Sequence, residues 1–132
     1  MNRYISQWWT VQLPDGWNAD EDTTCVTIHF MPALGALQLS AARNSTNIVT
    51  DDDLLELAKE HLDAGARIKS VICGLFTGFY LHYSYNEIYQ RQWWLRCGNT
   101  VILATYTSDL KIKGQEDIAV DNILNTLKIN DK

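Results

Sequence analysis

The chain has 132 residues, of which 46% are hydrophobic and 20% are charged, and its net charge is −5. This length fits one domain, residues 1–132, that buries roughly two-thirds of its unfolded surface without disulfides or metals. No basic stripe is present to neutralise phosphates, so we expect no nucleic-acid partner. Residues Met1 to Ser6 do not resemble a signal peptide, and no apolar run could span a membrane. We therefore expect an acidic cytoplasmic protein.

Period-two patterns predict three strands in the first third of the chain. The first strand runs from about Tyr4 to Leu13 and ends at Pro14-Asp15-Gly16, a strong turn signal. Cys25 to Phe30 and Ala36 to Arg43 each alternate apolar and polar residues. These two segments are predicted to form a hairpin.

A helix is predicted from Asp51 to Ala64. Thr50 is the expected N-cap, because Asp53 follows three residues later as in a capping box. The aspartates at positions 51 to 53 would lie at the positive end of the helix dipole, which explains them without any ligand. An alternative is that these acids and Asp20-Glu21-Asp22 attract a basic protein surface. Residues 1–58 hold eight of the sixteen acids but two of the eleven bases.

The second half of the chain predicts four strands and a closing helix. The strands cover about Arg67 to Cys73, Phe79 to Asn86, Tyr89 to Cys97 and Thr100 to Thr107. Apolar residues spaced i, i+3, i+4 and i+7 then predict a helix from about Gln115 to Leu127. The predicted fold class is α+β, with a single antiparallel sheet of six or seven strands and two principal helices.

The adjacent tryptophans Trp93-Trp94 indicate a sheet covered on both sides, because neighbouring strand residues point to opposite faces. A two-residue turn at Gly98-Asn99 would pair Cys97 with Thr100. The side chains of this strand then divide into two apolar sets, Trp93 and Leu95 on one face and Trp94 and Arg96 on the other. Either helices lie on opposite faces, or one helix and an N-terminal segment carrying Trp17 cover them.

A family resemblance is carried by four features of the chain. They are the strand ending in Leu13-Pro14-Asp15-Gly16-Trp17, the Gly35-Ala36-Leu37-Gln38-Leu39-Ser40 strand, the aspartate-led helix, and the C-terminal helix after a Tyr-containing strand. In their order and spacing these features resemble small PsbP-like domains. That fold is shared by the photosystem extrinsic protein PsbP, the Ran-binding protein Mog and bacterial DcrB-like domains, which include secretion-effector adaptors. The resemblance implies binding without catalysis, and it carries no functional residue over to this chain.

The sequence contains only weak signals for a catalytic or metal site. The three cysteines are odd in number and widely spaced, which favours reduced thiols: Cys25, Cys73 and Cys97. The histidines lack the spacing that brings two metal ligands together from one element: His29, His61 and His82. Cys73 or Cys97 could act as a nucleophile with His82 as its base, if neighbouring strands bring them together. We predict no cofactor and no metal, and enzymatic activity is the less favoured alternative.

A binding surface is predicted on the pair of strands that precedes the Gly98-Asn99 turn. Two sets of residues alternate along these strands: Tyr80, His82, Ser84 and Asn86, and then Gln90, Gln92, Trp94 and Arg96. If the connecting loop has an odd number of residues, the two sets share a face. Because Tyr, Trp and Arg dominate binding hot spots, the predicted binding residues are Tyr80, His82, Trp94 and Arg96. The alternative is a face partly covered by a helix, with amphipathic side chains at its edge.

The favoured function is a non-catalytic protein-interaction module, such as an adaptor, a chaperone or an immunity-type protein. Its predicted partner is another protein, and the oligomeric state is left open. The alternative is a small-molecule binder or minor enzyme with a pocket between sheet and helix. An exposed apolar groove would favour the first function, and a closed pocket with convergent polar groups the second.

Overall fold

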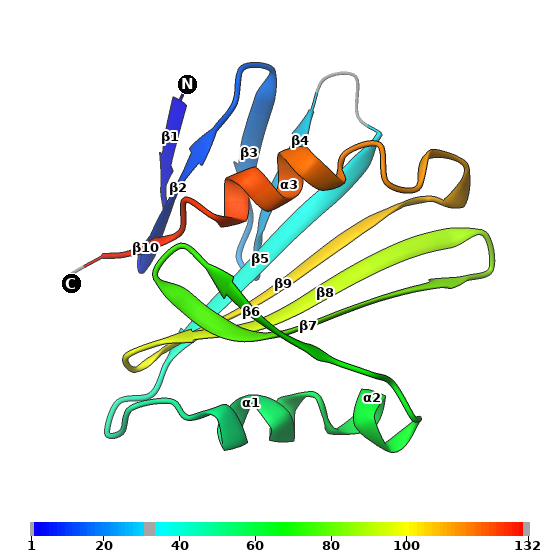
Figure 1. Cartoon of the computed structure of the whole chain (residues 1–132). Coiled ribbons are helices and arrows are strands. Elements are labelled where there is room, and N and C mark those ends of the chain that lie inside the picture. Colours follow the sequence, from blue (N-terminus) through cyan, green and yellow to red (C-terminus); the bar gives the residue numbers. More distant parts are fainter. Residues whose placement is uncertain (1, 31–33, 131–132) are drawn as a thin grey trace.

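The computed structural model describes residues 2–30 and 34–130. It contains two antiparallel sheets (Figure 1). The larger has seven strands in the order β3-β4-β5-β9-β8-β7-β6: β3 (Trp17–Glu21), β4 (Val26–Phe30), β5 (Gly35–Arg43), β6 (Lys69–Cys73), β7 (Phe76–Tyr85), β8 (Ile88–Cys97) and β9 (Thr100–Asp109). The smaller has the order β1-β2-β10: β1 (Asn2–Ile5), β2 (Trp9–Leu13) and β10 (Lys128–Ile129). The helices are α1 (Asp51–Leu57), α2 (Lys59–Asp63), η1 (Leu110–Ile112) and α3 (Asp117–Leu124).

The predicted α+β class is confirmed, but the prediction of a single sheet is wrong. The segment Tyr4 to Leu13 is not one strand, because the chain reverses between Ser6 and Trp9, where the Ser6 N–H donates to the Trp9 carbonyl at 2.8 Å. The resulting strands β1 and β2 pair with each other, and β10 pairs with the other edge of β2. The N-terminal segment therefore builds a sheet of its own with the end of the chain.

The two predicted helices lie where the sequence places them, but they are shorter, and η1 was not predicted. The first predicted helix divides into α1 and α2 at Ala58, whose φ of −90° and ψ of 5° leave the helical region. The predicted capping box is confirmed: the Asp53 N–H donates to Thr50 Oγ1 at 3.2 Å, and the Thr50 N–H donates to Asp53 Oδ2 at 2.9 Å. Among the described residues, no helix combines the length and the apolar character needed to cross a bilayer.

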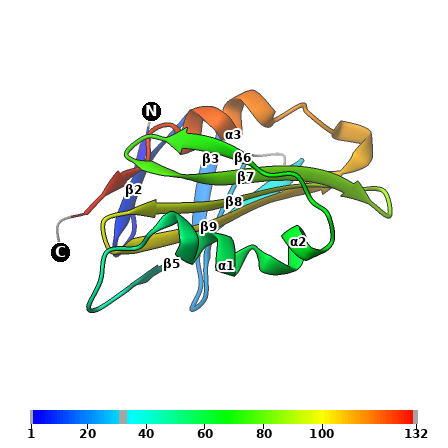
Figure 2. The ribbon, with the colours of Figure 1, turned by 60° about the horizontal axis from the view of Figure 1, so that its bottom comes forward.

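Strand β8 serves two hydrophobic cores, one on each face of the large sheet. The predicted register is confirmed, because Cys97 pairs with Thr100. Trp93, 2% exposed, belongs to a core shared with α3, Trp17 and the small sheet. Trp94, 1% exposed, belongs to a second core beneath α1 and α2. Figures 1 and 2 show α3 on one face of the sheet and α1 with α2 on the other.

We predict that Trp93→Ala and Trp94→Ala each lower the free energy of unfolding by about 3–5 kcal/mol, because each removes a large aromatic from a packed core. Urea melts of both variants and the wild type measure the loss. The matched control is Tyr85→Ala, since Tyr85 is 70% exposed, and its loss should stay below about 0.5 kcal/mol. A loss below about 1 kcal/mol for either tryptophan would contradict the two-core description.

Candidate functional site

The turn between β7 and β8 decides which predicted binding residues lie together. Tyr85 pairs with Ile88, so the loop has an even number of residues, Asn86 and Glu87, both with positive φ (49° and 65°). Such conformations are typical of two-residue hairpin turns. The predicted binding face requires a loop with an odd number of residues, and the structure does not meet that condition.

The four predicted binding residues consequently divide between the two faces. Tyr80 lies opposite Trp93 in the β7–β8 ladder, so Tyr80 and His82 face α3. Trp94 and Arg96 face α1 and α2 instead. Trp94 is buried there, with its ring 5.4 Å from that of His61, and Arg96 Nε donates to Asp51 Oδ1 at 2.7 Å. These last two side chains hold the α1–α2 segment on the sheet.

Tyr80 lines a cleft that opens beneath the edge strand β6. The cleft has a volume of about 310 Å³ and lies between β6, β7, β8 and α3. Its lining combines apolar and polar side chains: Val71, Ile72, Cys73, Trp93 and Leu124 with Tyr80, Arg91, Asp121 and Asn125. Because the buried Arg91 lines this cleft together with Asp121, we take the cleft as the candidate functional site.

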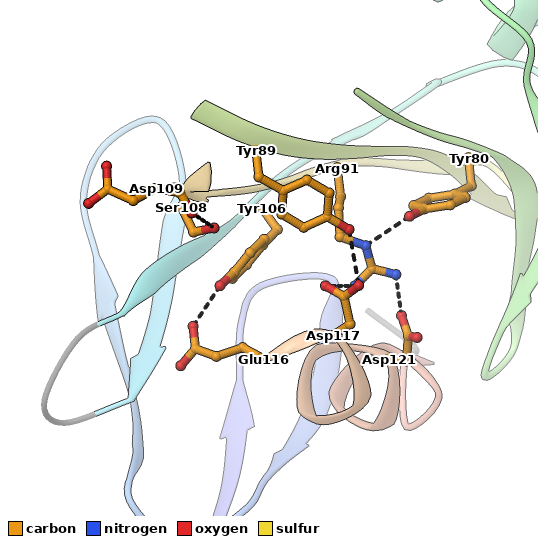
Figure 3. A network of polar contacts seen from close by, with 9 residues as sticks. All are labelled: Tyr80, Tyr89, Arg91, Tyr106, Ser108, Asp109, Glu116, Asp117 and Asp121. Carbon is orange, nitrogen blue, oxygen red and sulfur yellow. Dashed lines mark hydrogen bonds and ion pairs between the residues drawn. The ribbon is translucent and has the colours of Figure 1, made fainter. Parts of the chain in front are cut away.

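Arg91 is the centre of a polar network in this cleft (Figure 3). Its Nε donates to the Tyr80 hydroxyl at 2.9 Å and its Nη2 to Asp121 Oδ1 at 2.6 Å. Its Nη1 lies 3.5 Å from Asp117 Oδ1, and the side chain is 6% exposed. Burial lowers the pKa of Arg91, but the hydrogen bonds to Tyr80 and Asp121 outweigh it and raise the pKa above its ordinary value. The guanidinium also lies 4.6 Å from the centre of the Trp93 ring.

Two buried tyrosines extend the network along the start of α3. The Tyr89 hydroxyl donates to Asp117 Oδ2 at 3.0 Å, and the Tyr106 hydroxyl donates to Glu116 Oε1 at 2.7 Å. Burial raises the pKa of both phenols above its ordinary value, and the carboxylate acceptors raise it further. Two strands of the sheet, β8 and β9, thus donate hydrogen bonds from hydroxyl and guanidinium groups to the start and first turns of α3 (Figure 3).

Sequence reasoning missed Arg91, although a signal was present. Tyr89, Arg91 and Trp93 alternate on one face of a strand, so the arginine stands on an otherwise aromatic face. Asp117 and Asp121 are four residues apart on the closing helix and therefore lie on the same side of it. A buried cation beside a helix with two carboxylates at this spacing is the pattern that would have predicted the network.

The hypothesis of a cysteine nucleophile with His82 as its base is wrong on geometry. Cys73 pairs with Phe76, six residues before His82 along β7. His82 pairs with Arg91, six residues before Cys97 along β8. Six residues of a strand span about 20 Å, so neither thiol reaches His82. Within residues 2–30 and 34–130, no group of three His, Cys, Asp or Glu side chains could hold a metal ion.

No protein-family model and no curated protein matches this chain. Solved structures that are similar to it in fold include one from a cyanobacterium and one from Bacteroides thetaiotaomicron. The solution structure of cyanobacterial PsbP (CyanoP) from Synechocystis sp. PCC 6803 has a TM-score of 0.52 at 11% identity. The match covers 98% of this chain and 92% of the CyanoP chain. The fold is PsbP-like. This confirms the resemblance, and at such identity the PsbP-like likeness concerns the fold alone.

A crystal structure at 1.50 Å of a protein from Bacteroides thetaiotaomicron VPI-5482 is also similar, with a TM-score of 0.73 at 17% identity. The match covers 98% of this chain and 48% of the Bacteroides chain. The chain therefore spans about half the length of that protein. The fold similarity in this match extends over nearly all of the present chain.

A second surface gathers exposed apolar side chains around the β7–β8 turn. We call it the hairpin patch, and it consists of Tyr83 (40% exposed), Tyr85 (70%), Ile88 (42%) and Leu110 (40%). Tyr83 lies opposite Gln90. Gln90 and Gln92 therefore share a face of the sheet with Tyr83 and Tyr85, and not with Tyr80 and His82 as predicted. Beside the patch, a second cleft of about 310 Å³ is lined by His61, Ala64, Ala66, Arg67, Leu81, His82 and Tyr83.

We predict that Cys73 reacts slowly with a thiol reagent at pH 8, and that its rate rises with pH towards about 11. Burial raises the pKa of this thiol from 9.0 to about 11, and the thiolate is the reactive form. Mass spectrometry after timed labelling of the native protein separates Cys73 from the half-buried Cys25 and Cys97, which should react first. All three should react rapidly in urea. If native Cys73 is labelled at pH 8 as fast as in urea, its thiol is not buried and its pKa is not raised.

Proposed function

We propose that this protein is a non-catalytic interaction module that binds another protein. General acid–base catalysis works best with groups whose pKa lies near the working pH. The pKa values of Cys73 in the cleft and of Tyr89 and Tyr106 in the adjoining network are raised instead, away from neutrality. Arg91 is already engaged with Tyr80 and Asp121. This arrangement favours a structural role for the network and a binding role for the surface.

The observation that carries the proposal is the exposure of Tyr83 and Tyr85. Tyr85 pairs with Ile88 across the β7–β8 ladder, and the Leu110 N–H donates to the Glu87 carbonyl of the same turn. Tyr83 lies at the margin of α2, with its ring 6.1 Å from that of His61, and is still 40% exposed. A cluster of exposed apolar side chains marks an interaction site more often than isolated ones do. Tyrosine combines a rigid apolar ring with a hydrogen-bonding hydroxyl, and it is enriched among the residues that dominate interfaces.

The surroundings of the hairpin patch favour a partner with a basic rim. The exposed acids on the neighbouring helices outnumber the bases: Asp52, Glu56, Glu60 and Asp63 stand beside Lys59, which is paired with Asp63 at 2.9 Å. Complementary charge at the rim speeds association and selects among partners. The proposed partner therefore offers an apolar centre that covers the tyrosines and basic residues that face α1 and α2.

We predict that truncation of the patch weakens binding without unfolding the protein. A photo-crosslinking amino acid at position 85, introduced in the native cells, identifies the bound protein by mass spectrometry. With that protein purified, Tyr83→Ala and Tyr85→Ala should each weaken binding by about 2 kcal/mol, and the melting temperature should barely change. The matched control is Ile118→Ala, because Ile118 is 77% exposed but lies on α3. Unchanged affinity in both tyrosine variants would refute the assignment to this surface.

A small-molecule binder is the second candidate, and the cleft beneath β6 is the observation that favours it. Tyr80, Asp121 and Asn125 line this cleft together with Trp93. A thermal-shift screen of common metabolites would test this candidate. A compound that raises the melting temperature of the wild type but not of Asn125→Ala supports it, and a screen without such a compound counts against it.

A further inference from the structure

Strand β6 is an open edge of the large sheet. It is the last strand in the sheet order and pairs with β7 alone among the described residues. Half of the backbone N–H and C=O groups of an edge strand point away from the sheet and can pair with another strand. The β6–β7 ladder runs without interruption from Lys69 to Cys73, and β6 contains no proline. Ile72 is 73% exposed on this edge.

The opposite edge of the sheet, β3, is protected by charge. It ends in Asp20 and Glu21, and Asp22 follows directly. Antiparallel pairing of β3 with a second β3 about Ala19 would make the two Asp20 carboxylates diagonal neighbours about 7–8 Å apart. Charged side chains of one sign are a common device against edge-to-edge association. The two edges therefore differ, and β6 is the one that can accept a copy of itself.

We propose that β6 pairs antiparallel with β6 of a second copy of this chain, about a twofold axis at Val71. The two seven-stranded sheets then form one continuous sheet. In this register Val71 faces its own counterpart, Ser70 faces Ile72 of the second copy, and Lys69 faces Cys73 of the second copy. A twofold interface is self-complementary, so every contact forms twice.

Charge complementarity supports this register on the α3 face. Lys69 and Cys73 lie on that face, because they pair with Tyr80 and Phe76 of β7. Asp121 lines the same cleft as Cys73, and its side chain is 51% exposed while one of its oxygens accepts from Arg91. Residues directly opposite on paired strands have Cβ atoms about 5 Å apart. Lys69 of the second copy thus enters the cleft mouth beside the exposed Asp121 carboxylate.

Apolar cover supports the register on the other face. Ile72 is exposed there on each copy. The two Ile72 side chains become diagonal neighbours about 7–8 Å apart, within reach of each other. Pairing therefore removes from water an isoleucine that no described element covers.

The proposal is independent of the proposed function, because the hairpin patch lies at the far end of β7 from the β6–β7 turn. Pairing at β6 leaves Tyr83 and Tyr85 exposed in both copies. Such a dimer presents two hairpin patches, and a partner with two matching surfaces would gain avidity.

Analytical ultracentrifugation over a wide concentration range tests the proposal, with a substitution at each face of the interface. We expect the wild type to reach twice the monomer mass. Ile72→Asp and Lys69→Glu should each raise the dimer dissociation constant by at least about tenfold. The matched controls are Ile48→Asp and Lys111→Glu, which make the same changes at exposed positions elsewhere. Both controls should stay within about twofold of the wild type.

Hydrogen exchange on the wild type gives a readout that needs no variant. The amides of β6 should become more protected as protein concentration rises, while those of β3 should not. A protein that stays monomeric at millimolar concentration overturns the proposal. A dimer that keeps its affinity in Ile72→Asp, or β6 exchange that is independent of concentration, overturns it as well. Unchanged dimerisation in Lys69→Glu shows that the register at Asp121 is wrong.

Discussion

The burial of the Arg91 guanidinium is the constraint on which the rest of the structure depends. A charged side chain that is 6% exposed is tolerated only when opposite charges and hydrogen-bond acceptors surround it. Tyr80 supplies one acceptor from β7, and α3 supplies the carboxylates of Asp117 and Asp121. The position of α3 along the sheet and the side that it turns towards the sheet are therefore both linked to one residue of β8.

That link requires the register of β8 to be fixed, and two-residue turns fix it at both ends. A slip by one residue would turn Arg91 towards α1 and Trp94 towards α3. Both cores would then lose their central side chains. The alternation of side chains between the two faces also limits which surfaces a partner can reach. The hydrogen-bond donors on the α3 face bind α3, whereas the exposed tyrosines lie on the other face. Surfaces available to a partner are thus those that the network and the helices leave uncovered.

The sequence was a good guide where a local signal decides the structure. Thr50 and Asp53 predicted the start of α1, and Gly98-Asn99 predicted the register of β8 and β9, because caps and turns depend on residues that are close in the chain. It was a poor guide at the Asn86-Glu87 turn, since a glutamate at positive φ is unusual and its conformation is set by the strands it joins. The reversal near Ser6 was missed for a related reason: no glycine, proline or asparagine marks it. The cleft could not be predicted, because Arg91, Tyr80 and Asp121 come from three elements that only the tertiary fold brings together.

The most direct test of this account compares two ways of breaking the Arg91 network in urea melts. The double variant Asp117→Asn with Asp121→Asn leaves a buried cation without its carboxylates, so we expect a loss of about 3–5 kcal/mol in the free energy of unfolding. Arg91→Met keeps an apolar side chain of similar length and leaves carboxylates that are 31% and 51% exposed and can be hydrated. Its loss should be smaller. A loss in Arg91→Met that equals or exceeds that of the double variant would contradict the view that the buried charge dictates where α3 lies.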